Sequence, residues 1–144
     1  MPVPGRELNL KNAIRMLLLA ISVAVRQVQR GCFYIFEHPH NATSWQCPAM
    51  LELPGDTADF DQCMVGLVGP KPADGEALLI KKRTKIKTNL PGLIEALGGQ
   101  NCDGSHDHMQ ITGQQAGCVM SKWSQVYPAP LCGIFSDCVC RVAR

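Results

Sequence analysis

Apolar side chains recur at intervals of three and four residues over the first 30 positions of the chain. This spacing places them on one helical face, and Lys11, Arg15, Ser22, Arg26 and Gln29 fall on the other. A glycine at position 31 supplies a stop signal. The pattern predicts an amphipathic helix over residues 6–30, with an apolar stripe made of Leu10, Ile14, Leu17, Leu18, Ile21, Val25 and Val28.

The uncharged run inside this helix covers only residues 16–25. A helix needs about 20 apolar residues to cross a bilayer, so we expect no membrane-spanning segment and no membrane partner. A secretory signal peptide is the alternative, because basic residues precede the run and Ser22-Val23-Ala24 resembles a cleavage site. The apolar stripe continues past that site, which favours a helix packed on the rest of the protein.

Alternating apolar residues and turn signals divide residues 32–98 into a core of strands, short helices and a hairpin. A Gly- and Pro-rich turn at 69–75 separates the two strands of the hairpin. The expected elements are a buried strand at 32–36, a helix from Ser44 to Leu51, strands at 60–68 and 77–88, and a helix at 91–97 capped by Asn89.

The last part of the chain combines a polar region with a final helix. Residues 99–126 are Gly-rich, contain cysteine and histidine, and predict a loop region. Apolar spacing predicts a closing helix over 129–142. Together these elements indicate one α/β domain over 1–144, with a long N-terminal helix, a small mixed sheet and a β-hairpin.

Composition narrows the function classes. The 144 residues are 46% hydrophobic and 18% charged, which excludes a disordered or fibrous chain. The net charge is only +2, so any anionic partner must be recognised by a local patch. Eight cysteines are present without a Cys-x-x-Cys pair, which argues against a zinc ribbon or a thioredoxin-type motif.

A local patch of positive charge lies in the second predicted strand of the hairpin, where five of the seven residues 81–87 are basic. On a strand, alternate side chains share a face and form a cationic ladder that suits phosphates. The alternative is an edge strand whose lysines prevent edge-to-edge pairing. We therefore predict DNA or RNA as a candidate partner, bound through Lys81, Lys82, Arg83, Lys85 and Lys87.

A second candidate site follows the first predicted strand. Glu37 stands where open α/β sheets place reactive residues, and its carboxylate could accept hydrogen bonds from a heterocycle. A strand-end Glu that only caps the next turn is the alternative. Glu37 is thus a weak catalytic candidate.

A third candidate site lies in the stretch from Cys102 to His108. Zinc prefers thiolate and imidazole ligands in tetrahedral sets, and this stretch supplies three of them. A distant cysteine, Cys118 or Cys132, would have to supply the fourth. The predicted zinc set is Cys102, His106, His108 and Cys132, with a polar loop around a partly buried cysteine as the alternative.

Several short motifs follow one another along the chain. In order, they are Phe36-Glu37-His38-Pro39, Ser44-Trp45, Asp61-Gln62-Cys63, Lys81-Lys82-Arg83-Thr84, Thr88-Asn89, the Cys102–His108 stretch, and Tyr127-Pro128 with Leu131-Cys132. Over residues 27–135 their order resembles a segment of retrotransposon-derived polyproteins of protists and fungi, including copia-type elements of dinoflagellates. That segment is distantly similar to the latter half of a cytosine-5 DNA methyltransferase domain. The resemblance implies that residues 1–144 are one truncated α/β domain, a partial, Rossmann-like (methyltransferase-like) three-layer fragment.

The resemblance implies that Glu37 lies where the base-contacting Glu of the methyltransferase lies, and that Lys82–Lys85 belong to the hairpin of the same site. The chain departs from these patterns at Arg83, Leu90 and His38, where Pro, Ser and Asn are usual. The cofactor-binding glycines and the Pro-Cys nucleophile would precede residue 1. We therefore expect no catalysis.

The resulting expectation is a non-catalytic polyprotein fragment in the cytoplasm or nucleus that binds nucleic acid weakly. The first alternative is a small zinc-binding structural module built on the Cys/His loop. The second is a secreted glycoprotein with four disulfides, for which Asn41-Ala42-Thr43 would be the glycosylation sequon.

Overall fold

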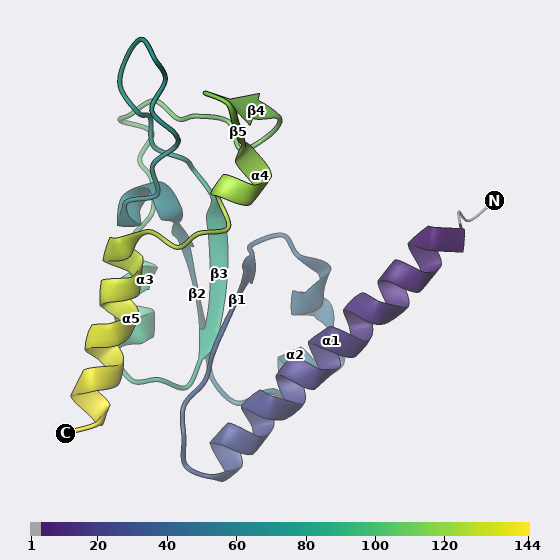
Figure 1. The fold of residues 1–144 in the computed structure, drawn as a ribbon. Coiled ribbons are helices and arrows are strands. Elements are labelled where there is room, and N and C mark those ends of the chain that lie inside the picture. Colours follow the sequence, from purple (N-terminus) through teal and green to yellow (C-terminus); the bar gives the residue numbers. More distant parts are fainter. Residues whose placement is uncertain (1–3) are drawn as a thin grey trace.

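In the computed structural model, which describes residues 4–144, helices cover both faces of a three-stranded sheet (Figure 1). Helices α1 and α2 lie on one side of the sheet, and α3 and α5 lie on the other. In chain order the elements are α1 (Pro4–Gln29), β1 (Ile35–Pro39), the 3-10 helix η1 (Thr43–Gln46), α2 (Pro48–Glu52), β2 (Asp56–Asp61), the 3-10 helix η2 (Gln62–Val65), β3 (Arg83–Thr88), α3 (Leu93–Gly98), β4 (Gln114–Gln115), β5 (Cys118–Val119), α4 (Met120–Trp123) and α5 (Ala129–Val142).

Strand β3 is the centre of the sheet, whose order is β1-β3-β2, and it pairs antiparallel with both neighbours. The expected mixed sheet is therefore wrong. Strands β1 and β2 run in the same direction, but β3 lies between them, so they form no parallel ladder. The structure shows a mixed α/β fold with a long N-terminal helix and small antiparallel sheets, and it does not confirm a Rossmann-like fragment.

The first strand lies three residues later than predicted, and it is a half-exposed edge strand rather than a buried one. Side-chain hydrogen bonds hold the segment before it in place of ladder bonds. Asn89 Oδ1 accepts from the Tyr34 N–H at 3.0 Å, and Asn89 Nδ2 donates to the Cys32 carbonyl at 3.1 Å. Asn89 thus fixes this entry to β1 and does not cap α3, whose N-cap is Gly92.

The predicted hairpin is present, with shifted strands. Residues 56–61 form β2, whereas the predicted strand at 60–68 is interrupted by η2. Beyond η2 the two arms pair again, because the Ile80 N–H donates to the Leu67 carbonyl at 2.8 Å. The closing helix is confirmed at Ala129–Val142, and α1 confirms the long N-terminal helix.

Each face of the sheet carries its own hydrophobic cluster. Phe60 and Ile86 pack with Leu93, Leu97 and Leu131 from α3 and α5, and all five side chains are fully buried. The opposite cluster, next to α1 and α2, contains Ile21, Ala24, Tyr34, Met50 and Leu53. Burial of this kind contributes about 25 cal/mol per Å² of apolar surface and stabilises the layered arrangement.

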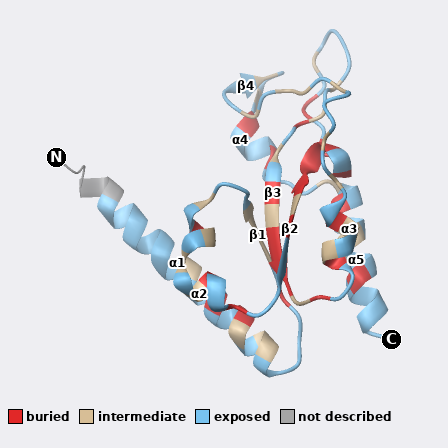
Figure 2. Cartoon of the chain, turned by 180° about the vertical axis from the view of Figure 1, so that it is seen from behind, coloured by how far each residue is buried: buried red, intermediate tan, exposed pale blue. Residues whose placement is uncertain are grey.

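The N-terminal helix packs on the domain only near its C-terminal end. Ile21 and Ala24 are its two buried residues among those described, and most of the remaining helix is exposed (Figure 2). The predicted stripe continues through Leu10 and Ile14, but the domain is too short to cover these positions. The expected packed helix is therefore correct for one end of α1 and wrong for the other.

Tyr34→Phe should lower the free energy of unfolding by about 1 kcal/mol at neutral pH, because the Tyr34 hydroxyl donates a 2.7 Å hydrogen bond to the Pro54 carbonyl. Burial, and then the charge of Asp56, raises the pKa of Tyr34 from 10.0 to about 12. A raised pKa means that the folded state keeps this proton longer than the unfolded chain does. Its stabilisation is complete below pH 10 and is lost as the pH rises to 12.

Urea denaturation of both proteins from neutral pH to pH 12 measures this effect. The difference in unfolding free energy between wild type and Tyr34→Phe should shrink across the alkaline range. A difference that stays constant would contradict the assignment.

Candidate metal centre

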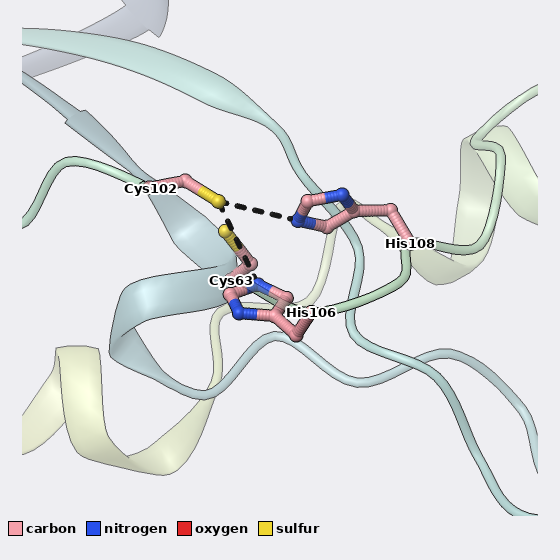
Figure 3. Close-up of side chains that lie close together, drawn as sticks. All are labelled: Cys63, Cys102, His106 and His108. Atoms are coloured by element: carbon pink, nitrogen blue, oxygen red, sulfur yellow. Dashed lines mark hydrogen bonds between the residues drawn. The ribbon is translucent and has the colours of Figure 1, made fainter. Parts of the chain in front are cut away.

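Two cysteines and two histidines from separate parts of the chain converge beside the end of β2 (Figure 3). The four donor atoms of Cys63, Cys102, His106 and His108 all lie within 4.8 Å of one another. Cys102 Sγ is 3.7 Å from His106 Nε2 and 3.5 Å from His108 Nε2. This group could hold a metal ion.

The spacing of these donors matches the requirements of zinc. In tetrahedral zinc sites the Zn–S distance is about 2.3 Å and the Zn–N distance about 2.0–2.1 Å, which places sulfur and nitrogen ligands about 3.5 Å apart. Both sulfur–nitrogen distances from Cys102 are close to this value. The side chains therefore need little movement to surround an ion.

Strand β2 and the 3-10 helix after it position Cys63. The Gln62 N–H donates to the Lys82 carbonyl at 3.1 Å, and the Gln62 side chain donates to Thr84 Oγ1 at 2.9 Å. Gln62 is fully buried, so both bonds form in a dry environment where they hold η2 against β3. Cys63 follows directly and is itself buried.

The loop that carries the other three donors is fixed at both ends. Near its start, the Asp61 N–H donates to the Gln100 carbonyl at 2.8 Å, and the Cys102 N–H donates to Asp61 Oδ2 at 2.9 Å. Near its end, His108 forms a β-bridge with Leu79, and the Met109 N–H donates to the Leu79 carbonyl at 2.8 Å. The donors are thus held by backbone pairing and not by the loop alone.

A tight turn directs one backbone donor toward the sulfur of Cys102. The Gly104 N–H donates to Cys102 Sγ at 3.4 Å, and the Ser105 N–H donates to Asp103 Oδ1 at 2.9 Å. Gly104 has a φ of 78°, a left-handed conformation that glycine adopts without strain. An N–H aimed at sulfur stabilises the thiolate, which is the form that binds metal.

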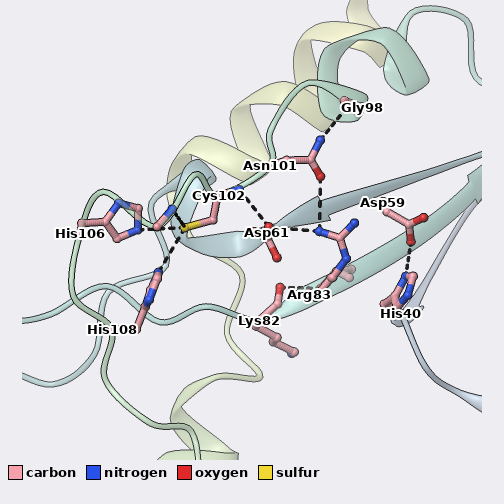
Figure 4. Close-up of polar contacts among 12 residues, drawn as sticks. His40, Asp59, Asp61, Lys82, Arg83, Gly98, Asn101, Cys102, His106 and His108 are labelled. Carbon is pink, nitrogen blue, oxygen red and sulfur yellow. Dashed lines mark hydrogen bonds and ion pairs between the residues drawn. The ribbon is translucent and has the colours of Figure 1, made fainter.

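Asp61 connects the loop to the sheet (Figure 4). Its Oδ2 accepts from the Cys102 N–H and from Arg83 Nη1, the latter at 3.2 Å, while its Oδ1 is buried without a protein partner. The side chain is 1% exposed. A carboxylate this deeply buried requires such partners, so Asp61 couples the position of Cys102 to that of β3.

The thiol of Cys63 is protonated at neutral pH when no metal is present. Burial raises its pKa to about 11, with further contributions from the hydrogen bond and charge of Cys102 and from Asp61, while Lys81 acts in the opposite direction. A metal ion that binds here must displace this proton.

The structure corrects one member of the predicted ligand set. Cys102, His106 and His108 come together as predicted, but Cys132 is exposed on α5, where its Sγ donates to the Tyr127 carbonyl at 4.0 Å. Cys118 lies in β5 and is also outside the cluster. Cys63 takes the fourth position, because the pairing of β2 with β3 brings η2 to the loop.

No local pattern in the sequence identifies Cys63 as a metal ligand. Cys63 precedes Cys102 by 39 residues, and β3 and α3 lie between them. It stands in the Asp61-Gln62-Cys63 motif, which indicates only the family resemblance and no metal ligand.

The basic segment is largely engaged in contacts within the protein. Arg83 and Lys85 stand opposite Asp61 and Asp59 in the ladder, and each forms an ion pair with the acid it faces. Lys87 is buried, its Nζ donates to the Met50 carbonyl at 2.6 Å, and burial lowers its pKa.

Two lysines precede the strand itself. Lys82 Nζ donates to the Ser124 carbonyl at 2.9 Å, which leaves Lys81 as the member of the segment for which the described residues supply no such partner. Nucleic-acid binding through this segment stays a prediction. On β3 itself, two of the three basic side chains are paired with aspartates and the third donates to backbone carbonyls, partners that the sequence did not identify.

Glu37 lies on the exposed edge strand and not at the end of a buried one. Its Oε2 accepts from the Tyr127 hydroxyl at 2.6 Å, and its Oε1 is buried without a partner. Burial, and then the hydrogen bond to Glu37, raises the pKa of Tyr127. Within the described residues Glu37 therefore ties β1 to the segment before α5, and its catalytic role stays a prediction.

Comparison of the chain with family models, with curated proteins and with solved structures gives no match. The geometry of the cluster formed by Cys63, Cys102, His106 and His108 is accordingly the observation from which function is inferred.

Proposed function

We propose that this protein is a zinc-binding structural module, with the ion held by Cys63, Cys102, His106 and His108. The convergence of these four donors within 4.8 Å carries the proposal. No other arrangement of cysteine and histidine in the described residues is supported by comparable geometry.

Zinc is the metal that the donor set favours. Two sulfurs and two imidazole nitrogens in a tetrahedral arrangement suit zinc, whereas magnesium and calcium require oxygen ligands. Two thiolates balance the +2 charge of the ion, so the site would be neutral with neutral imidazoles. A neutral site is compatible with the burial of Cys63.

The role of the metal is structural. Four protein ligands complete a tetrahedral site and leave no position for water or substrate, which distinguishes structural zinc from catalytic zinc. The ion would join η2 to the loop over residues 99–111, a segment with few regular hydrogen bonds of its own. It would thereby stabilise a loop that is not held by hydrogen bonds of regular secondary structure.

The purified full chain should bind one zinc ion, and Cys63→Ser or Cys102→Ser should abolish stoichiometric binding. A serine hydroxyl is a poor zinc ligand, so each substitution removes one of four ligands. Inductively coupled plasma mass spectrometry of the protein after gel filtration measures the number of zinc ions bound per chain. Zinc at 100 times its dissociation constant should raise the free energy of unfolding by about 2.7 kcal/mol.

Cys132→Ser is the matched control, because this cysteine lies outside the cluster and should leave zinc content unchanged. Loss of zinc in Cys132→Ser with retention in Cys63→Ser would restore the ligand set expected from the sequence. An absence of zinc binding by the folded wild-type protein would refute the proposal.

Asp61→Asn should weaken zinc binding by about tenfold, the lower end of the range for residues that support a metal ligand. The substitution keeps the size of the side chain but removes the charge that attracts the Cys102 N–H and Arg83. Competition with a chromophoric chelator measures the affinity. Asp59→Asn is the control, since Asp59 lies on the same strand and pairs with His40 and Lys85, away from the loop.

A further inference from the structure

A large part of α1 remains apolar and exposed in the folded protein. The most apolar 18-residue window of the helix, within Glu7–Gln29, has a mean hydropathy of 1.5, yet only 11% of that window is buried. Such a helix is long and apolar enough to cross a membrane by length and composition. Its N-terminal end points away from the sheet, so the fold leaves that end uncovered (Figure 1).

The exposed side of α1 continues into a shallow apolar groove beside the start of β1. Ten residues line it, and the six exposed ones are called the α1–β1 groove here: Met16, Leu19, Ala20, Val23, Phe33 and Ile35. Its five large side chains are between 37% and 65% exposed. A contiguous exposed surface of large aliphatic and aromatic side chains is typical of a docking site.

Only positive charges accompany the groove in the sequence. Residues 8–36 contain Lys11, Arg15, Arg26 and Arg30 but no Asp or Glu, so this segment carries a charge of +4. The rest of the chain then has 10 basic and 12 acidic residues and a charge of −2. On a helical wheel Arg15, Arg26 and Arg30 flank Leu19 and Val23, while Lys11 pairs with Glu7 at 3.0 Å.

This positive charge indicates which kind of partner could cover the α1–β1 groove, a second copy of the chain or a lipid surface. A second copy of the chain would place the same three arginines against themselves across a symmetric interface, where like charges repel. The groove needs an occupant that is both apolar and negatively charged. An anionic lipid surface has both properties, because its acyl chains accept the apolar side chains and its headgroups attract the arginines. The hydroxyl of Ser22, which lies in this part of the helix, donates to the Leu19 carbonyl at 2.7 Å, so its hydrogen bond does not depend on water.

We propose that the α1–β1 groove is a peripheral membrane-binding surface that docks on anionic lipid bilayers. The helix lies along the interface and does not span it, because its C-terminal part stays packed on the domain through Ile21 and Ala24. The uncharged run of the helix, residues 16–25, is also only about half as long as a spanning helix needs. This proposal revises the expectation of no membrane partner, which considered only spanning segments, and it is independent of the zinc site.

Sedimentation of the full chain with large unilamellar vesicles tests the proposal. Vesicles of phosphatidylcholine with roughly one-third phosphatidylserine should bind the protein, and vesicles of phosphatidylcholine alone should bind it much more weakly. Replacing Arg15, Arg26 and Arg30 by Gln should reduce binding by on the order of 100-fold, since each cation near an anionic surface contributes about fivefold.

The apolar contribution needs its own variant. Leu19→Gln with Val23→Gln should also abolish binding to anionic vesicles, and circular dichroism should show an unchanged fold because both positions are exposed. Matched controls are Leu51→Gln with Val126→Gln, which alter equally exposed apolar residues elsewhere, and Arg141→Gln with Arg144→Gln, which remove exposed charges. These controls should bind as the wild type does.

Three results would overturn the proposal. The first is binding to both vesicle types that the arginine substitutions leave unchanged. The second is an absence of vesicle binding by folded protein. The third is a dimer in gel filtration that Leu19→Gln with Val23→Gln dissociates, since a second copy would then occupy the groove.

Discussion

The pairing of β3 with both of its neighbours is the interaction on which the rest of the structure depends. Its central position buries Thr84, Ile86, Lys87 and Thr88 and creates the two sheet faces that the helices cover. The same register places η2, at the end of β2, beside the loop that follows α3. The core and the candidate metal centre therefore share one cause.

Polar side chains hold the parts of the molecule that the ladder does not reach. Asn89 and Thr88 bind the segment before β1, since Thr88 Oγ1 donates to the Tyr34 carbonyl. Asp61 binds the loop through the Cys102 N–H, and Lys87 binds the last carbonyls of α2. Each of these bonds satisfies a polar group in a largely dry environment, where an unpaired one would cost about 1–3 kcal/mol.

The two proposed sites lie at opposite ends of the sheet, the metal centre beside the end of β2 and the α1–β1 groove beside the start of β1, and they draw on different physical properties. The metal centre depends on soft ligands held by a rigid support, and its chemistry is local. The α1–β1 groove depends on apolar area and on the exclusion of acidic residues from a segment of 29 positions, 8–36. The two sites share no residue, so an ion at the first leaves the lining of the second unchanged.

The sequence by itself determined the features whose interactions are local. Helical periodicity located α1 and α5, and the clustering of Cys102, His106 and His108 identified three of four candidate ligands, because residues a few positions apart stay close in any fold. Only the tertiary structure decided that Cys63 is the fourth candidate ligand and which groups pair with the basic side chains of β3. Both depend on which strand pairs with β3 and in what register. A shift of one residue in that register would exchange the two faces of the strand, and no local pattern in this chain specifies it.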